Sequence, residues 1–252
     1  MTTAAKPIIE VQGLTAAYGE ETILENLSFT VGHGEVFVIL GGSGCGKSTL
    51  LKHLIGLYQP AKGHIFIDGQ DLVSTYGESR QSLLRKIGVM YQHGALFGSM
   101  TLLENLCLPL EEFSELPETA RNLIATMNLS LVGLAGHHHY YPAEISGGMR
   151  KRAAIARAMV LGPQILFLDE PSAGLDPITS AEMDELILRL AGSLGMTIVV
   201  VSHELPSIHA IADQAIMLDK ETKGIAARGT PQQLAHSDNV QVRQFFARQA
   251  GN

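Results

Sequence analysis

The chain has 252 residues, a length that fits one large domain or one and a half. Hydrophobic residues make up 46% and charged residues 17%, which excludes a disordered chain, and 18 Lys and Arg against 25 Asp and Glu give a net charge of −7, which argues against nucleic acid as a partner. The two cysteines exclude a disulfide framework, and we expect neither a secretory signal nor a membrane-spanning helix.

The first third of the chain is predicted to be rich in short strands. One helix interrupts them at residues 50–55, where apolar side chains recur at helical spacing before Gly56 and Pro60 end the pattern. The predicted strands are 8–11, 22–31, 35–40 and 63–67.

The middle third is predicted to be helical, and in the last third strands and helices alternate. Thr101 and Glu104 have the spacing of a capping box, and Pro117 can open another helix. The alternation afterwards predicts a parallel sheet with helices on both faces. The predicted strands there are 165–168, 197–201 and 215–218, with helices from 177 and at 205–212.

A phosphate-binding loop is predicted between the strand at 35–40 and the helix after it, because residues 41–48 match the pattern G-x-x-x-x-G-K-[ST]. Glycines let backbone N–H groups wrap phosphates, Lys47 reaches the β and γ oxygens, and Ser48 ligates Mg²⁺. Cys45, beside Lys47 at a helix start, is expected to have a lowered thiol pKa and to react with alkylators, although a free thiol can equally be passive filler. The predicted ATP-binding residues of this loop are Gly41, Gly42, Ser43, Gly44, Cys45, Gly46, Lys47, Ser48 and Thr49.

Two acidic residues follow the apolar strand at 165–168. Ligands of open α/β sheets bind at the carboxyl ends of strands, where Asp169 is placed to hold Mg²⁺ and Glu170 to orient or deprotonate an attacking water. Together with the phosphate loop, this pair predicts ATP hydrolysis.

Further motifs resemble those of the ABC ATPases, from about Ile8 to Gly229. Ser146, Gly147 and Gly148 open an Arg-rich helix and resemble the signature loop of that family. Four other residues resemble family motifs in the family's order: Tyr18 the aromatic residue that stacks on adenine, Gln92 the Q-loop glutamine, Asp176 the D-loop aspartate and His203 the switch histidine.

The resemblance implies the α/β P-loop ABC ATPase fold, with a mainly parallel sheet core, an N-terminal antiparallel β subdomain and an inserted helical subdomain. We expect a single ABC ATPase domain over 1–252. Its expected parts are the core with the antiparallel subdomain at 1–92 and 163–229, the helical subdomain at 93–162, and a C-terminal helical tail at 230–252.

The resemblance also implies a head-to-tail homodimer that binds ATP and Mg²⁺. The segment 146–148 would grip the γ-phosphate of ATP bound to the partner, and Asp176 would sit at the dimer seam while also capping the helix after it. His203 would contact the γ-phosphate, and Gln92 would touch Mg²⁺ or the water. Catalytic roles are thus expected for Glu170, His203 and Gln92, and Mg²⁺ ligation for Ser48, Gln92 and Asp169.

A narrower resemblance links the chain to the Mla-type ATPases, which energise phospholipid traffic between the inner and outer membranes of Gram-negative bacteria. It rests on Met149 after the signature glycines and on the segments 150–154, 176–179 and 242–245. It implies a homodimer beneath an integral membrane permease at the cytoplasmic face of the inner membrane, with an MCE-domain lipid-binding protein and a STAS-domain subunit. The alternatives are the ATPase of an ABC importer for a small polar solute and a soluble ABC ATPase outside transport.

The segment between Gln92 and Leu110 is the expected contact site for such a permease. Apolar residues there either form a surface groove or belong to the helix core. These apolar residues are Leu96, Phe97, Met100 and Leu102. The acidic residues that follow are expected to form a solvated face; they are Glu111, Glu112, Glu115 and Glu118.

Overall fold

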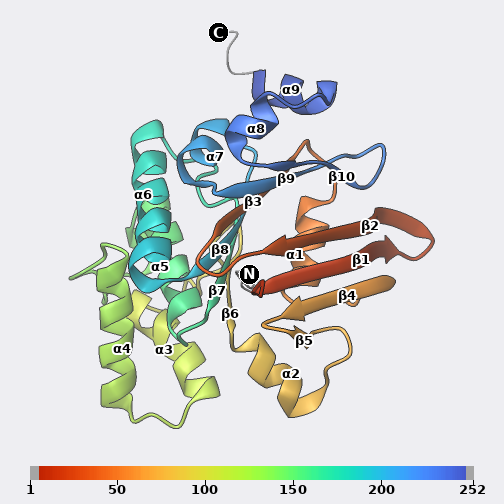
Figure 1. Cartoon of the computed structure of the whole chain (residues 1–252). Helices are drawn as coiled ribbons and strands as arrows, with labels where there is room; N and C mark the ends of the chain where they lie inside the picture. Colours follow the sequence, from red (N-terminus) through yellow and green to blue (C-terminus); the bar gives the residue numbers. More distant parts are fainter. Residues whose placement is uncertain (1–5, 248–252) are drawn as a thin grey trace, which may run out of the picture.

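The computed structural model describes residues 6–247, in which two β-sheets lie side by side (Figure 1). The smaller sheet is antiparallel, with four strands in the order β2-β1-β4-β5. Its strands are β1 (Ile9–Tyr18), β2 (Glu21–Val31), β4 (Lys62–Ile67) and β5 (Gln70–Asp71).

The larger sheet has six strands in the order β10-β9-β3-β8-β7-β6. All neighbouring pairs are parallel except β10 with β9, so the sheet is mainly parallel as predicted. Its strands are β3 (Val36–Gly41), β6 (Ile87–Met90), β7 (Ile165–Asp169), β8 (Thr197–Val201), β9 (Gln214–Leu218) and β10 (Ile225–Gly229).

Both faces of the larger sheet are buried, which explains why its central strands are continuous apolar runs. Along β3, Phe37 and Ile39 face a core shared with helix α1 (Lys47–Leu54) and the antiparallel sheet. Val38 and Leu40 face the opposite core, shared with the helices that follow β6 and β7.

A run of helices lies between β6 and β7. It contains α3 (Leu102–Phe113), α4 (Glu118–Leu131), the short 3₁₀ helix η1 (Pro142–Glu144) and α5 (Gly147–Met159). The capping box is confirmed, since Thr101 Oγ1 accepts from Glu104 N at 3.2 Å while Glu104 Oε2 accepts from Thr101 N at 2.7 Å. Pro117 stands directly before α4.

The remaining helices are α2 (Gly77–Leu84), α6 (Pro177–Leu194), α7 (Leu205–Ile211), α8 (Pro231–Ala235) and α9 (Val240–Ala247). Strands β5, β6 and β10 and helix α2 are not among the predicted elements; β5 has only two residues, and β6 has four and includes a glycine. The end of the predicted tail, 248–252, lies outside the described residues.

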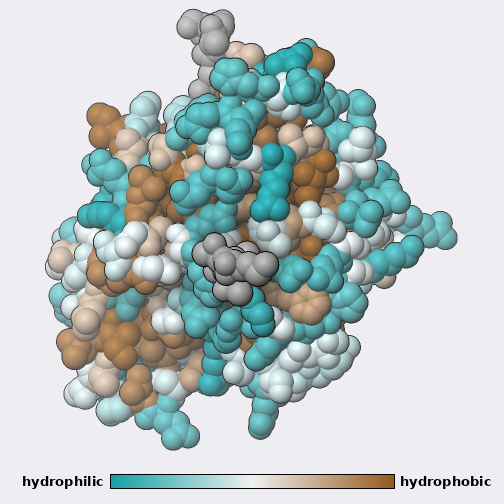
Figure 2. Space-filling model, in the orientation of Figure 1, coloured by the Kyte–Doolittle hydropathy of each residue, from teal (hydrophilic) through white to brown (hydrophobic). Residues whose placement is uncertain are grey.

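Within the described part, none of the helices is both long and apolar enough to cross a membrane. Figure 2 shows apolar side chains gathered over α3 and α4.

Candidate active site

Four neighbouring parallel strands end at one edge of the larger sheet, and each is followed by a residue that the sequence singles out. Lys47 follows β3, His203 follows β8, Glu170 follows β7 and Gln92 follows β6. Because parallel strands have their carboxyl ends at the same edge, residues far apart in the chain meet there.

The predicted phosphate loop lies between β3 and α1. Lys47 Nζ donates to the carbonyl oxygens of Gly41 at 2.8 Å and Gly42 at 3.0 Å, which places its charge inside the loop. Gly46 has φ 99°, and a Cβ there would lie 2.6 Å from Leu24 Cδ2, so only glycine fits. Helix α1 begins directly after it, and its first turn supplies free N–H groups to an anion.

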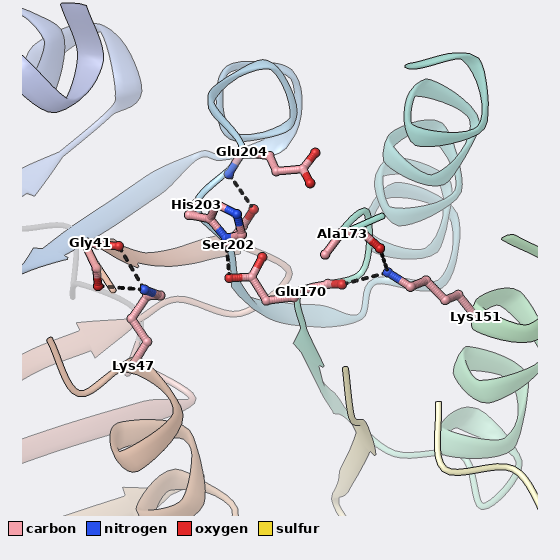
Figure 3. Close-up of polar contacts among 9 residues, drawn as sticks. Gly41, Lys47, Lys151, Glu170, Ala173, Ser202, His203 and Glu204 are labelled. Atoms are coloured by element: carbon pink, nitrogen blue, oxygen red, sulfur yellow. Dashed lines mark hydrogen bonds and ion pairs between the residues drawn. The ribbon is translucent and has the colours of Figure 1, made fainter. Parts of the chain in front are cut away.

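Glu170 and His203 form a pair between β7 and β8. Glu170 Oε1 lies 2.7 Å from His203 Nδ1 (Figure 3). The Glu170 side chain is buried, and its Oε2 has no hydrogen-bond partner among the described residues. A buried carboxylate oxygen of this kind is free to accept a hydrogen bond from a water or a substrate group.

Asp169, the last residue of β7, is partly buried next to Glu170. Burial raises the pKa of the Asp169 carboxyl, the negative charge of Glu170 raises it further, and the positive charge of Lys47 offsets part of this shift. A bound cation would relieve the same repulsion. With the Ser48 hydroxyl and the Gln92 amide, Asp169 provides an all-oxygen donor set, the kind that Mg²⁺ prefers.

Lys151, which is not among the predicted site residues, contacts this site from α5. Its Nζ donates to the carbonyl oxygen of Glu170 at 3.0 Å and to that of Ala173 at 2.6 Å (Figure 3). Burial lowers the pKa of the Lys151 ammonium, while the carboxylates of Glu204 and Glu170 act in the opposite direction. No local pattern distinguishes Lys151 from the arginines on either side of it.

The predicted signature segment forms the start of α5. Ser146 is the N-cap, and its hydroxyl accepts from Met149 N at 3.2 Å. Gly148 packs against α6, where a Cβ would come within 2.5 Å of Thr179 Cγ2. A cleft of about 380 Å³ beside this segment is lined by Gln92, His93, Gly147, Arg150, Lys151, Ala173, Gly174 and Leu175.

This cleft brings Gln92 and Gly147 together, but no residue of the phosphate loop lines it. The signature segment and the loop of one chain therefore do not share this cleft. Asp176 lies just beyond it as the N-cap of α6, accepting from Ile178 N and Thr179 N, both at 3.1 Å. The predicted cap at Asp176 is thus confirmed.

Tyr18 lies at the end of β1 with nearly half of its surface exposed. Its ring meets Tyr58 edge to face, with centroids 5.9 Å apart, and Lys52 Nζ lies over the Tyr58 ring at 5.6 Å. The exposed aromatic pair offers a π surface beside α1. Tyr58 is not among the predicted site residues, because no local motif marks it. The packing of α1 against β1 brings it to Tyr18.

Cys45 differs from the expectation. The residue is buried, and this burial raises the pKa of its thiol, while the charge of Lys47 offsets only part of the shift. The expected lowering of the pKa is therefore wrong. Proximity to a cation and a helix start is outweighed by the loss of solvent around the sulfur.

The segment between Gln92 and Leu110 divides between core and surface. Leu102 is fully buried in the core, whereas Phe97 is half exposed. Glu111 forms an ion pair with Arg121 at 3.4 Å, so part of the predicted acidic face is paired. A cleft of about 470 Å³ is lined by Ser99, Met100, Thr101, Leu103, Glu104, Cys107, Leu108, Glu111, Glu118, Asn122 and His139.

The chain is similar to known proteins in sequence and in fold. The family described as "ABC transporter" matches residues 24–173. The "Intermembrane phospholipid transport system ATP-binding protein MlaF" of Haemophilus influenzae is 39% identical over 95% of this chain and 90% of its own length. The Escherichia coli protein of the same name is 38% identical over 95% of this chain and 88% of its own length.

Mycobacterial relatives are also similar. The "Probable ribonucleotide transport ATP-binding protein mkl" of Mycobacterium tuberculosis is 43% identical over 94% of this chain, which spans 66% of that protein's length.

Two solved structures share the fold. The dimeric ATP-binding cassette MJ0796 in a post-hydrolysis state, bound to ADP and Pi, has a TM-score of 0.79 and 29% identity over 88% of this chain and 98% of its own. The cbiO1 structure from Clostridium perfringens, part of the ABC transporter complex cbiONQ, has a TM-score of 0.83 and 28% identity over 93% of this chain and 92% of its own.

Proposed function

Since this chain belongs to the ABC transporter family, in which it is an ATP-hydrolysing subunit, we propose that it powers phospholipid transport between the inner and outer membranes. The observation that supports the cargo is the similarity to the MlaF proteins, because the match covers 95% of this chain and 88% to 90% of theirs. Such coverage leaves little of either chain unmatched.

In the proposed mechanism, the phosphate loop and Lys47 bind the phosphates of ATP through backbone N–H groups and one fixed positive charge. Glu170 orients the attacking water and takes its proton at the free Oε2. His203 holds Oε1 of that carboxylate and presents its exposed ring to the γ-phosphate.

Mg²⁺ is the proposed metal cofactor, and its proposed ligands are Ser48, Asp169 and Gln92. When bound, Mg²⁺ neutralises charge on the phosphate oxygens. The residues on this edge fit a cation because the carboxylates of Asp169 and Glu170 lie next to each other and repel, and a bound cation would offset this repulsion. Tyr18 is proposed to stack on adenine, with Tyr58 supporting its ring.

A head-to-tail homodimer is proposed to complete each site. Ser146 is the N-cap, and Gly147 and Gly148 begin a helix whose N–H groups can hold an anion, yet no residue of the phosphate loop of the same chain lines the cleft beside them. Their proposed ligand is the γ-phosphate on the partner subunit, with Asp176 at the seam. The similar cassette MJ0796 bound to ADP and Pi is dimeric, which supports this arrangement.

The proposed membrane partner is an integral permease, contacted at the cleft beside α3. Met100, Leu103 and Leu108 give this cleft an apolar lining, and three acidic residues stand in it. An apolar helix end carrying basic residues would complement it. The rest of the proposed assembly is an MCE-domain lipid-binding protein and a STAS-domain subunit, at the cytoplasmic face of the inner membrane.

A second candidate cargo is a small polar solute. It is favoured by the 43% identity to the mycobacterial proteins named for probable ribonucleotide transport, although the chain spans only 66% of their length. A soluble ABC ATPase outside transport is the third alternative.

The test is a pull-down of the full chain carrying Glu170→Gln from native membranes with Mg-ATP, followed by mass spectrometry of proteins and lipids. Lys47→Ala is the matched control, because it removes the charge that binds phosphate. Recovery of a permease, an MCE-domain protein and enriched phospholipid with Glu170→Gln but not with the control supports the proposal. A periplasmic solute-binding protein would favour the polar solute instead, and soluble partners alone would reject a transport role.

A further inference from the structure

We propose that Lys151 is a positioning residue that holds the main chain around Glu170 in its hydrolytic geometry and ties it to the helix that starts at the signature segment. The inference rests on the proposed role of Glu170 in hydrolysis. Nothing in the family resemblance or in the relatives' names assigns this task to Lys151.

The contact joins two elements that are far apart in the chain. Lys151 lies on the second turn of α5, and its Nζ donates to the carbonyl oxygens of Glu170 at 3.0 Å and Ala173 at 2.6 Å. Figure 3 shows the ammonium approaching from one side of this segment while His203 lies on the other. A single cation thus bridges both ends of the turn that leaves β7.

The turn needs such support because Glu170 has φ 51°, in the left-handed region that L residues rarely adopt. Such a conformation persists only when several contacts define it. Besides Lys151, Glu170 N donates to Val201 O at 2.9 Å, and its carboxylate contacts His203 at 2.7 Å. Lys151 supplies a charged contact on the carbonyl side of the residue.

The same bridge links movements of α5 to the catalytic carboxylate. Ser146, the N-cap of α5, lies about one and a half helical turns from Lys151, so the signature segment and the ammonium move as parts of one rigid helix. The carbonyl of Ala173 is the second acceptor, and Ala173 belongs to the same segment as Asp176, between β7 and α6. A shift of the signature segment is therefore transmitted to Glu170 and to the D-loop together.

Lysine suits the task because its stem is long and its ammonium offers several donors to two carbonyl oxygens. Methionine keeps a similar length without a donor, and arginine keeps the charge with several donors. These two substitutions separate hydrogen bonding from packing.

The test compares Lys151→Met and Lys151→Arg in the full chain, with Lys86→Met as the matched control. Lys86 pairs with Asp68 away from this edge of the sheet, so its replacement also removes one ion pair. We expect Lys151→Met to lower kcat for ATP about ten- to hundredfold, with KM, ATP binding and the midpoint of thermal unfolding matching the control. Lys151→Arg should restore most of kcat.

The same substitution is made in the Glu170→Gln background. If Lys151 acts through Glu170, Lys151→Met changes the residual rate there by less than about twofold. An equal loss of kcat in both backgrounds would overturn the inference, as would unchanged kcat in a wild-type background that hydrolyses ATP. Absence of hydrolysis by the unsubstituted protein would reject the proposed function instead.

Discussion

Glu170 Oε1 lies 2.7 Å from His203 Nδ1, and this contact joins the ends of two neighbouring strands, β7 and β8. The pair leaves the second carboxylate oxygen buried without a partner among the described residues. One oxygen is thus held by the protein and the other is free for chemistry.

Replacing Glu170 with Gln is expected to reduce phosphate release by about 10²- to 10⁴-fold while ATP binding persists, because an amide keeps the shape but cannot take the proton. Phosphate release and equilibrium binding of ATP are the two measurements. Glu185→Gln, on the exposed face of α6, serves as the control. Normal turnover by a pure Glu170→Gln protein would reject the assigned role.

Alkylation of Cys45 is expected to be slow near neutral pH and to speed up only above the ordinary thiol pKa of 9.0, because burial raises the pKa and shields the sulfur. The measurement is the iodoacetamide labelling rate in a Cys107→Ser variant, folded and in denaturant, between pH 7 and about pH 10. Rapid, complete labelling of the folded protein at pH 7 would contradict the structure.

Asp184 lies buried on α6, near the hydroxyls of Ser172 and Ser207, and its Oδ1 has no partner among the described residues. Burial raises the pKa of its carboxyl above 3.8, and hydrogen bonds from the two serines offset part of this shift. The charged form is therefore disfavoured in the folded state. The stabilisation that comes from the protonated Asp184 carboxyl is fully present below pH 3.8 and is lost as the pH rises through the folded pKa.

Asp184→Asn is accordingly expected to raise the free energy of unfolding at pH 7, with a gain that shrinks toward zero as the pH falls below 3.8. Urea unfolding at a series of pH values measures the difference. A gain that does not depend on pH would show that packing, and not ionisation, is responsible.

Gly148→Ala is expected to lower the free energy of unfolding by about 1–2 kcal/mol, because the new methyl group would lie 2.5 Å from Thr179 Cγ2. Thr179→Ser removes that methyl group and keeps the hydroxyl that contacts Asp176. In the Thr179→Ser background, alanine at 148 should therefore cost little or nothing.

Gly147→Ala is the control for this prediction, since its added Cβ would meet its nearest neighbour at 3.8 Å in the same helix. Urea unfolding of the four variants and of the unsubstituted protein gives the comparison. If Gly147→Ala and Gly148→Ala lowered the free energy of unfolding equally, the cause would be the loss of glycine at the helix start and not the contact with Thr179.

The parts of the candidate site that lie within short segments could be predicted from the sequence. The phosphate loop occupies residues 41–48, and the capping box of α3 spans four residues, so local spacing alone reveals both. The alternation of strands and helices also predicted the mainly parallel sheet. The direction of the shift at Cys45 could not be obtained this way, because burial depends on side chains from other strands.

The residues expected to carry the chemistry could be predicted from short segments: a lysine in a glycine-rich loop, two carboxylates after an apolar strand and a histidine after another. The contacts that hold them appear only in the folded chain, where Lys151 donates to the carbonyl oxygens of Glu170 and Ala173 and the ring of Tyr58 packs against Tyr18. Local motifs depend on neighbours along the chain. These contacts instead arise where sheet and helix packing brings distant segments within hydrogen-bond or van der Waals reach.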